Sequence, residues 1–292
     1  MRKIKELVIE KSLLSSALIT IAVTIGIVLV LAIEAFQFFS EVSILDFLTD
    51  TQWTPLFTDK HYGILPLLSG TLLTSFIAIA VALPIGLSIS IYLSEYAPKS
   101  FRKTVKPLLE LLAAVPTVVY GFFALIVVTP FLQQIIPGLS GFNSLSAGFV
   151  MGIMIIPYIS SISEDALHAV PNALREASFG MGATKLQTAF KVVVPAASSG
   201  IIVSIILAIS RAIGETMIVA VAAGQQPRLT LDPTVPVETI TAYIVQVSLG
   251  DVEHGSVEYR TIFAAGITLF VFTFLLNTLS YRIRKKYQER YD

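Results

Sequence analysis

Six long apolar stretches dominate this sequence of 292 residues and limit what it can fold into. They cover about residues 13–36, 64–94, 108–132, 145–163, 198–223 and 261–281. A helix that crosses a bilayer needs about 20 mainly apolar residues, so each stretch is long enough to span a membrane. Only 14% of the residues are charged, against about a quarter in a soluble domain. The pattern predicts an all-α, polytopic membrane helix bundle, with six transmembrane helices in a single domain over residues 1–292.

The basic residues lie mostly on one side of this predicted bundle. Sixteen of the 20 precede the first stretch, follow the last, or lie in the loops after the second and fourth. They are Arg2, Lys3, Lys5, Lys11, Lys99, Arg102, Lys103, Lys106, Arg175, Lys185, Lys191, Arg282, Arg284, Lys285, Lys286 and Arg290. Because cytoplasmic loops carry the excess of Lys and Arg, both termini are predicted to be cytoplasmic. The first stretch is longer than the apolar region of a secretory signal, which favours a retained span.

The fifth stretch contains two charged residues, in the sequence AISRAIGETMIV at 208–219. An ionisable group deep in a membrane nearly always faces the interior of a helix bundle. Arg211 and Glu215 are four residues apart, so on a continuous helix they share one face. A stripe of small residues runs beside that face: Gly200, Ser204, Ala208 and Ala212. Small residues allow a neighbouring helix to approach closely, which places the charged face inside the bundle.

Arg211 and Glu215 admit two interpretations. They could form an ion pair that holds the bundle together, or they could be one step of an anion pathway. Arginine's planar fork matches tetrahedral oxyanions, and a neighbouring carboxylate accepts a hydrogen bond from a protonated oxyanion but repels a fully ionised one. We therefore hypothesise a preference for hydrogen phosphate over sulfate.

Other polar or small residues could line the same path, with ordinary hydrogen bonding between helices as the alternative. Those candidates are Gly70, Thr71, Thr74, Thr117 and Tyr120. Trp53 and Tyr62, in the first outer loop, are interpreted as anchors at the membrane interface.

The cytoplasmic loop 164–195 is too apolar for a simple solvated connection. A short helix is predicted over 172–179 after Pro171, because proline suits the start of a helix. A turn follows at Gly180 and Gly182. A second helix is predicted to start at Thr184, with a capping box, and to end before Pro195. The first helix and the turn carry apolar residues: Leu174, Ala177, Phe179 and Met181. These residues either pack under the bundle or dock a cytoplasmic partner, and the loop sequence alone leaves both interpretations open.

The segment EASFGMGATKLQTAFKVVVP resembles the EAA loop of ABC-importer permeases. The matching positions include Glu176, Ala177, Gly182 and Ala183, while Ser178 replaces an alanine. In that family the loop forms a coupling helix in a groove of the ATPase subunit. The resemblance therefore implies that these four residues couple the chain to an ATPase on a separate polypeptide. ATP and magnesium would be bound by that partner, and no cofactor by this chain.

Further segments resemble the phosphate-specific ABC-importer permeases, and more specifically the C-type of their two paralogous chains. They are GILPLLSGTLLTS, IYLSEYAP, AAVPTVVYGFFAL and SRAIGETMIVAVAAG. The resemblance implies the type I permease fold in a bacterial or archaeal cytoplasmic membrane. It also implies four kinds of partner: a paralogous permease, two copies of the ATPase, an extracytoplasmic phosphate-binding protein and inorganic phosphate itself.

Several other functions find no support in the sequence. No phosphate-binding loop of the form G-x-x-x-x-G-K-[ST] occurs, so we expect no ATP hydrolysis by this chain. Cysteine is absent and the three histidines are scattered, which argues against a metal site or a catalytic centre. The net charge of +0 means that no overall basic excess suggests a nucleic-acid partner. Two alternatives stay open: a permease for another oxyanion, such as sulfate or molybdate, and an ion-driven secondary transporter.

Overall fold

The computed structural model describes residues 2–287, and that part of the chain is helical apart from two isolated β-bridges and the connecting loops. Arg290, one of the basic residues used to orient the bundle, lies outside the described residues. The helices are α1 Arg2–Glu41, α2 Ile44–Thr49, α3 Leu65–Ile91, α4 Lys99–Ala114, α5 Thr117–Phe123, α6 Thr129–Ile135, α7 Ser144–His168, α8 Asn172–Gly180, α9 Lys185–Thr188, α10 Val194–Ala196, α11 Ser198–Ile213, α12 Met217–Ala222, α13 Ile240–Leu249 and α14 Val257–Tyr287. Short π-helical turns follow α3, α5 and α9, at Tyr92–Tyr96, Ala124–Val128 and Ala189–Val193.

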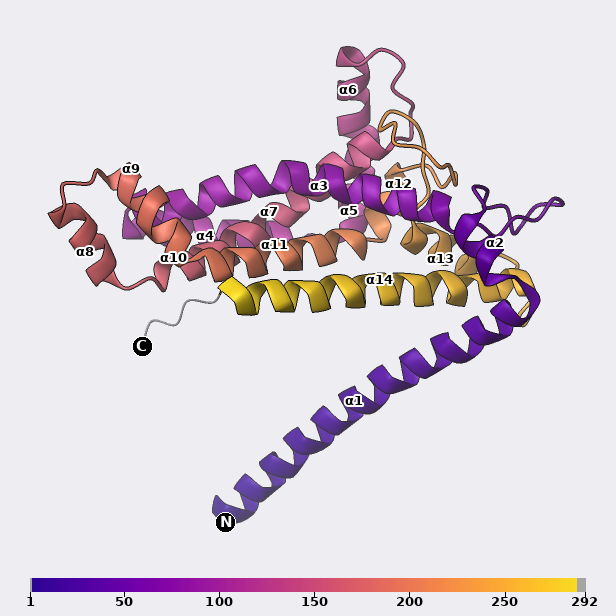
Figure 1. Cartoon of the computed structure of the whole chain (residues 1–292), viewed down its shortest axis with the longest axis horizontal. Helices are drawn as coiled ribbons and strands as arrows, with labels where there is room; N and C mark the ends of the chain where they lie inside the picture. The colour runs from indigo at the N-terminus through magenta and orange to yellow at the C-terminus, as the bar shows by residue number, and fades with distance from the viewer. Residues whose placement is uncertain (1, 288–292) are drawn as a thin grey trace.

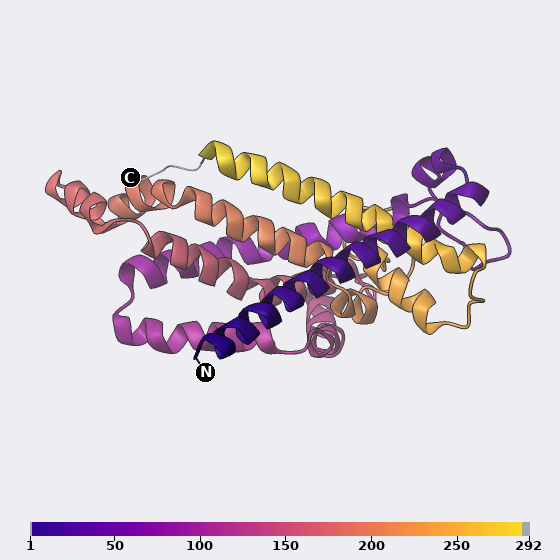
Figure 2. The ribbon, with the colours of Figure 1, turned by 90° about the horizontal axis from the view of Figure 1, so that it is seen from below.

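The long helices α3, α7, α11 and α14 run roughly parallel to one axis of the molecule (Figures 1 and 2). The start of α1 and the end of α14, together with α8 and α9, lie toward one end of this axis, which we call the terminal end. The opposite end carries α2, α13 and the connections around them, and we call it the loop end. The long helices therefore form the helix bundle that the sequence predicts.

The core of the bundle lies between α3 and α7, which pack along most of their length. Two glycines of α7 permit this approach. A Cβ atom on Gly148 would lie 2.7 Å from the Cβ of Ile77, and one on Gly152 would lie 2.8 Å from the carbonyl oxygen of Ala78. Because side chains cannot occupy these positions, the two backbones pack closely there, as small residues allow in membrane bundles. The large side chains Met151 and Ile155 fill the rest of the contact.

Among the described residues, five helices are long and apolar enough to cross a membrane. They are Val8–Glu41, Leu65–Tyr96, Thr117–Ile135, Ser144–His168 and Val257–Arg282. A sixth candidate is the pair Lys185–Ala196 and Ser198–Ile213, which is bent by 71°. The predicted stretches 13–36, 64–94, 145–163 and 261–281 each coincide with one of these helices. The other two predicted stretches, 108–132 and 198–223, differ from the observed helices.

The predicted span 108–132 is broken at Pro116. Val115 and Pro116 both have extended backbone, with ψ of 132° and 133°, because a proline pushes its predecessor out of the helical region and lacks an amide hydrogen. Residues 108–114 belong instead to α4, which has no buried side chain in the described structure. After the break, the continuous run from α5 to α6 stands at a steep angle to α3 and α7, upright in Figure 1 and end-on in Figure 2.

The predicted span 198–223 is also interrupted. Helix α11 ends at Ile213, and α12 begins only at Met217.

Two smaller predictions also differ from the structure. The helical run that starts at α9 continues through Pro195 to Ala196, because proline is tolerated in the first turn of α10. Trp53 is 1% exposed, so it is a core residue and not an interfacial anchor. Its ring packs edge-on against Phe47 and Tyr243 at the loop end.

Helix α1 differs from the others because most of it leaves the bundle. It packs on α14 near the loop end and diverges from the other helices toward its N-terminus (Figure 1). The side chains of residues 11–25 are all exposed. In a lipid environment this apolar helix needs no protein partner for its backbone, since an α-helix satisfies its own hydrogen bonds.

Candidate functional site

The break between α11 and α12 brings together the residues that the sequence analysis singled out in the fifth stretch. The carboxylate of Glu215 accepts hydrogen bonds from the backbone amides of Met217, at 3.1 Å, and Ile218, at 3.4 Å. A carboxylate at this position satisfies free amides at the start of a helix, as a capping residue does. Its side chain is 3% exposed. Glu215 is therefore fixed by α12, and it does not lie on a continuous helix with Arg211.

Arg211 is only loosely paired with Glu215. Its Nη2 lies 4.0 Å from the Oε2 of Glu215, at the outer limit of an ion pair, and its side chain is 41% exposed. The guanidinium lies 5.7 Å from the centre of the Tyr158 ring on α7, within the range of a cation–π contact. One side of the guanidinium of Arg211 therefore contacts the ring of Tyr158, and its N–H donors form no hydrogen bond with the described side chains. It faces out of this single chain, whereas the sequence predicted that it faces the interior.

The stripe of small residues beside Arg211 packs as predicted. Ser204, Ala208 and Ala212 are buried between α11 and α7. The hydroxyl groups of Ser204 and Ser163 lie 2.7 Å apart and join the two helices. A Cβ atom on Gly200 would lie 2.3 Å from the Cβ of Ala166. This contact fixes the rotation of α11 and so decides which way Arg211 points.

Two of the three candidate path residues of α3, Gly70 and Thr71, lie against the segment 237–240. A Cβ atom on Gly70 would lie 2.1 Å from the carbonyl oxygen of Glu238, so only glycine fits there. The hydroxyl of Thr71 accepts a hydrogen bond from the amide of Ile240 at 3.1 Å. The hydroxyl of Thr74 donates to the carbonyl of Gly70 at 2.8 Å. All three contacts are structural ones within this chain, but only the bond of Thr71 joins two separate elements, which is the alternative considered above.

The two candidates on α5 lie next to the break at Pro116. Thr117 is half-buried at the first position of α5. Tyr120 is buried, and its hydroxyl donates to the carbonyl of Leu112 at 2.7 Å across the break. Helix α5 packs on α12, which begins at the other break. Tyr120 thus holds α4 and α5 together, beside the helix that Glu215 caps.

Helix α13 contributes residues that sequence reasoning missed. The hydroxyl of Thr241 donates to the carbonyl of Glu215 at 2.7 Å and lies 3.1 Å from the hydroxyl of Thr239. The first turn of α13 therefore connects Thr71 on α3 with the α11–α12 break. The available signal was the pair of threonines two residues apart at the start of an apolar run of ten residues, which is too short to span a membrane.

Glu238, in the connection between α12 and α13, is a charged residue of a loop but is only 2% exposed. Its Oε1 has no hydrogen-bond partner within the described part of the chain, and neither has the Nε1 of Trp53. Both residues line a cavity of about 160 Å³ at the loop end. Burial raises the pKa of Glu238 to about 8, because desolvation penalises its charged form.

The second candidate region is the loop that contains α8 and α9. Helix α8 occupies 172–180, close to the predicted 172–179, and the predicted capping box of Thr184 and Gln187 is present. Gly182 has φ of +82°, a backbone conformation that favours glycine. Glu176, Ala177 and Gly182 are exposed at the terminal end, and Ala183 is half-buried.

The apolar residues of this loop divide into two groups. Leu174 packs on a core cluster formed by Leu167, Val170 and Val193. Phe179 and Met181 are 46% and 89% exposed. Packing under the bundle therefore accounts for Leu174 but leaves Phe179 and Met181 uncovered in this chain.

Arg175 anchors α8 to the end of the second span. Its guanidinium donates to both carboxylate oxygens of Glu95, at 2.8 and 3.2 Å, and to the carbonyl of Leu167 at 2.8 Å. The two side chains are only 14% and 8% exposed. A bidentate arginine–carboxylate pair fixes geometry as well as charge. Sequence reasoning used Arg175 only to orient the bundle, and the YLSEYAP segment gave no sign that Glu95 is its partner.

With this geometry established, comparisons with known proteins identify the family. The family described as "Binding-protein-dependent transport system inner membrane component" matches residues 82–291. The chain belongs to this family. Its members are transport components, and with its apolar helices the chain is a multi-pass membrane protein.

Two curated relatives cover most of the chain. A probable ABC transporter permease protein, YqgH of Bacillus subtilis (strain 168), is 37% identical over 89% of this chain and 84% of its own length. The phosphate transport system permease protein PstC of Mesorhizobium japonicum is 36% identical over 79% of this chain and 75% of its own length.

Solved structures show the same fold. A chain of the MetNI methionine ABC transporter, in an inward-facing conformation, has a TM-score of 0.57 at 20% identity and covers 78% of this chain and 95% of its own. A chain of a bacterial alginate ABC transporter, solved with its periplasmic protein, has a TM-score of 0.58 at 19% identity, covering 87% and 88%. The predicted fold, that of an ABC-importer permease, is confirmed.

Proposed function

We propose that this chain is a permease subunit of an ATP-driven phosphate importer and forms half of the translocation path. The single observation that carries the proposal is Arg211, which lies at a helix break with its side chain 41% exposed and its Nη2 4.0 Å from Glu215. An arginine with free donors in a membrane bundle marks an anion pathway. The relatives named as phosphate permeases support phosphate as that anion. A permease for another oxyanion is the second candidate, since the same fork also fits sulfate.

The geometry suggests how Arg211 handles the anion. Glu215 is held by the amides of α12, so it does not need Arg211 for its stability. An arriving oxyanion can therefore bind the guanidinium of Arg211 without breaking a strong ion pair with Glu215. A weak pairing suits transport, because a site that binds too strongly holds the ion and slows its release. The Oε2 of Glu215 stays close enough to accept a hydrogen bond from a protonated oxyanion, which favours hydrogen phosphate.

The exposure of Arg211 also bears on the partners. A half-exposed arginine is costly in lipid, so we place a second, paralogous permease over this face. The apolar residues Phe179 and Met181 would dock one of two copies of a separate ATPase, which carries the ATP and magnesium. An extracytoplasmic phosphate-binding protein would deliver the anion to the loop end. In this arrangement the terminal end, with both termini, is cytoplasmic, and the membrane is the cytoplasmic membrane of a bacterium or archaeon.

Uptake by the complete importer in proteoliposomes tests the proposal. We expect ATP-driven uptake of labelled phosphate in preference to sulfate and molybdate. Arg211→Ala is expected to lower uptake at least about a hundredfold, the scale of losing a charged hydrogen-bond donor at a critical step, while the complex still assembles and binds ATP. Arg228→Ala is the matched control, because Arg228 is exposed at the loop end and its side chain bonds to the neighbouring Gln226. Undiminished uptake by the Arg211 variant would refute the role of this residue.

Glu215→Gln separates the two candidate anions. The amide still accepts hydrogen bonds but no longer repels a fully ionised oxyanion, so the preference for phosphate over sulfate is expected to fall about tenfold. Competition between the two labelled anions measures it directly. An unchanged preference would show that Glu215 does not discriminate between them.

A further inference from the structure

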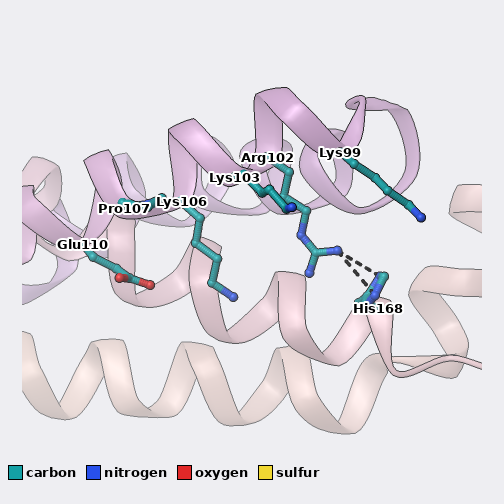
Figure 3. A pocket seen from close by; sticks show the side chains of 7 residues that line it. All are labelled: Lys99, Arg102, Lys103, Lys106, Pro107, Glu110 and His168. Carbon is teal, nitrogen blue, oxygen red and sulfur yellow. Dashed lines mark hydrogen bonds between the residues drawn. The ribbon is translucent and has the colours of Figure 1, made fainter.

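A basic pocket lies at the terminal end between α4 and α7, away from the two breaks. Its volume is about 430 Å³. The residues that line it are Lys99, Arg102, Lys103, Lys106, Pro107, Glu110 and His168. Figure 3 shows Arg102, Lys106 and Glu110 extending from α4 toward α7, with Arg102 against His168. Four of the seven lining residues are cationic and only one is anionic.

The cations of the pocket are of two kinds. Arg102 and Lys106 are held in place by the buried carboxylate of Glu164 on α7, and Lys106 also bonds to Asp165 at 2.6 Å. Burial alone would lower the pKa of Lys106, but the hydrogen bonds to Asp165 and Glu164 outweigh it and raise the pKa, so this ammonium stays charged. Lys99 and Lys103 form no ion pair with any described side chain. The pocket thus has two fixed cations in its wall and two free lysines at its edge.

The pocket lies beyond Arg211 along the axis of α7, toward the terminal end. Tyr158, under the guanidinium of Arg211, and Asp165, which holds Lys106, are both on this helix, almost two turns apart. The two side chains therefore share a face and are about 10 Å apart along the axis. His168, beside Arg102, lies about one further turn toward the terminal end. Arg211, Lys106 and Arg102 therefore follow one another along the axis of α7, with Arg211 reaching it from α11 and the other two reaching it from α4.

We propose that this pocket is a second anion site, which takes free phosphate from Arg211 and releases it at the terminal end. The inference rests on the proposed function, and it adds the route by which the anion leaves. Lys106 and Arg102 supply charged donors for the phosphate oxygens, while Lys99 and Lys103 raise the local concentration of the anion, as basic clefts do. The carboxylates of Glu164 and Asp165 share the same donors, which keeps the binding weak enough for release.

The absence of cysteine from the chain allows a direct binding test. Lys103→Cys places one thiol at the edge of the pocket, and Lys11→Cys places the control thiol on an exposed part of α1. We call these two positions the pocket thiol and the control thiol. The complete importer, with cysteine-free partners, is held without ATP in nanodiscs of zwitterionic lipid only. The rate of reaction with a neutral maleimide is then measured as inorganic phosphate is added.

When the phosphate concentration is about twice its dissociation constant, phosphate is expected to slow the reaction of the pocket thiol about threefold. The protection factor equals one plus the ratio of the phosphate concentration to the dissociation constant. The reaction of the control thiol is expected to stay unchanged. Equal slowing of both thiols, or none, overturns the proposal. So does a pocket thiol that does not react at all, since a site of release must open to the solution. Protection that appears only when anionic phospholipid is added would assign the pocket to a lipid headgroup, and it also overturns the proposal.

Uptake provides a second measurement with a matched control. Lys99→Gln with Lys103→Gln is expected to lower the maximal rate of phosphate uptake about fivefold, on the scale of losing electrostatic steering. Lys11→Gln with Arg228→Gln removes the same charge from exposed positions elsewhere and is expected to leave the rate unchanged. Equal rates for the two double variants count against the pocket.

The two proposals can fail separately. Protection of the pocket thiol is measured without transport, so it holds or fails whatever the Arg211→Ala variant does. An importer that takes up phosphate while the pocket thiol stays unprotected overturns the second site alone.

Discussion

Two arginine–glutamate pairs of this chain have the same chemistry and opposite geometry. In the pair at the end of the second span, Arg175 and Glu95 form two hydrogen bonds of 2.8 and 3.2 Å and are nearly buried. In the pair at the α11–α12 break, Arg211 and Glu215 approach to 4.0 Å at one contact, and the arginine is 41% exposed. The first guanidinium has its donors occupied, whereas the second still has donors to offer.

The difference shows that the surroundings of a pair decide its role. Arg175 also donates to the carbonyls of Leu167 and Val170, so it joins α8 to the ends of α3 and α7. A movement of α8 is therefore transmitted to two spans through one side chain. The carboxylate of Glu215 instead accepts hydrogen bonds from the backbone amides of α12. The tight pair suits the transmission of force, and the loose pair suits a passing anion.

The largest expected effect is the loss of the tight pair. Arg175→Ala leaves the carboxylate of Glu95 buried and unpaired, so we expect a loss of about 3–5 kcal/mol in unfolding free energy. Arg211→Ala is expected to cost less than about 1 kcal/mol, the range of exposed pairs. Unfolding of each variant by mixed micelles measures both. The comparison is sharpened by double-mutant cycles with Glu95→Gln and Glu215→Gln, which isolate the pair energies.

Arg175→Lys serves as the control for charge. Lysine keeps the positive charge but cannot form the bidentate contact, so we expect it to recover only part of the stability. Full recovery would show that charge alone holds α8. Equal coupling energies for the two pairs would contradict the contrast between them.

The two pairs also show what the sequence could predict. Arg211 was recognised as a candidate site residue because a charged residue is conspicuous within an otherwise apolar segment. The break after Ile213 was not predicted, since a lone glycine in a helical pattern is a weak signal. Arg175 and Glu95 are 80 residues apart, and only the folded chain shows that they meet. The capping box at Thr184 was predicted correctly because it depends only on residues that are close in sequence. The burial of Trp53 and Glu238 was missed because it depends on elements that are distant in sequence.

Glu238 extends the comparison to a carboxyl group with no cation. Its pKa is raised from 4.5 to about 8 by burial, so the folded chain keeps a proton that the unfolded chain releases. Stability is therefore expected to fall as the pH rises from 4.5 to about 8, by up to about 1.4 kcal/mol per pH unit. Glu238→Gln removes this dependence. Its apparent melting temperature is expected to exceed that of the wild type above the folded-state pKa and to match it below the unfolded-state pKa.

Melting in detergent at a series of pH values measures the effect. The exposed carboxylate of Glu253, changed to Gln at the same end of the molecule, is the control. A wild-type curve parallel to that of Glu238→Gln across the range would show that Glu238 is ionised in the folded chain and has an unseen partner.

A smaller effect concerns the surface that Arg175 positions. Met181 is 89% exposed on the turn after α8. If it docks the ATPase, Met181→Glu is expected to weaken the complex about tenfold, because burial of a methionine side chain contributes about 1.5–3 kcal/mol. Leu231→Glu is the matched control, since Leu231 is 82% exposed at the loop end. Retention of the ATPase on the immobilised permease pair measures the difference, and equal retention would place the docking surface elsewhere.

The smallest effect tests whether the turn itself is fixed once Arg175 holds α8. Gly182 has φ of +82°, while Gly180 ends α8 without a left-handed backbone, and neither would meet another atom if it carried a Cβ. Gly182→Ala is therefore expected to cost about 1 kcal/mol through backbone strain alone. Gly180→Ala, with the same added methyl group, is expected to be neutral or slightly stabilising. Because the two changes differ only in backbone conformation, equal stabilities would mean that the turn adjusts freely and that Arg175 alone determines the position of α8.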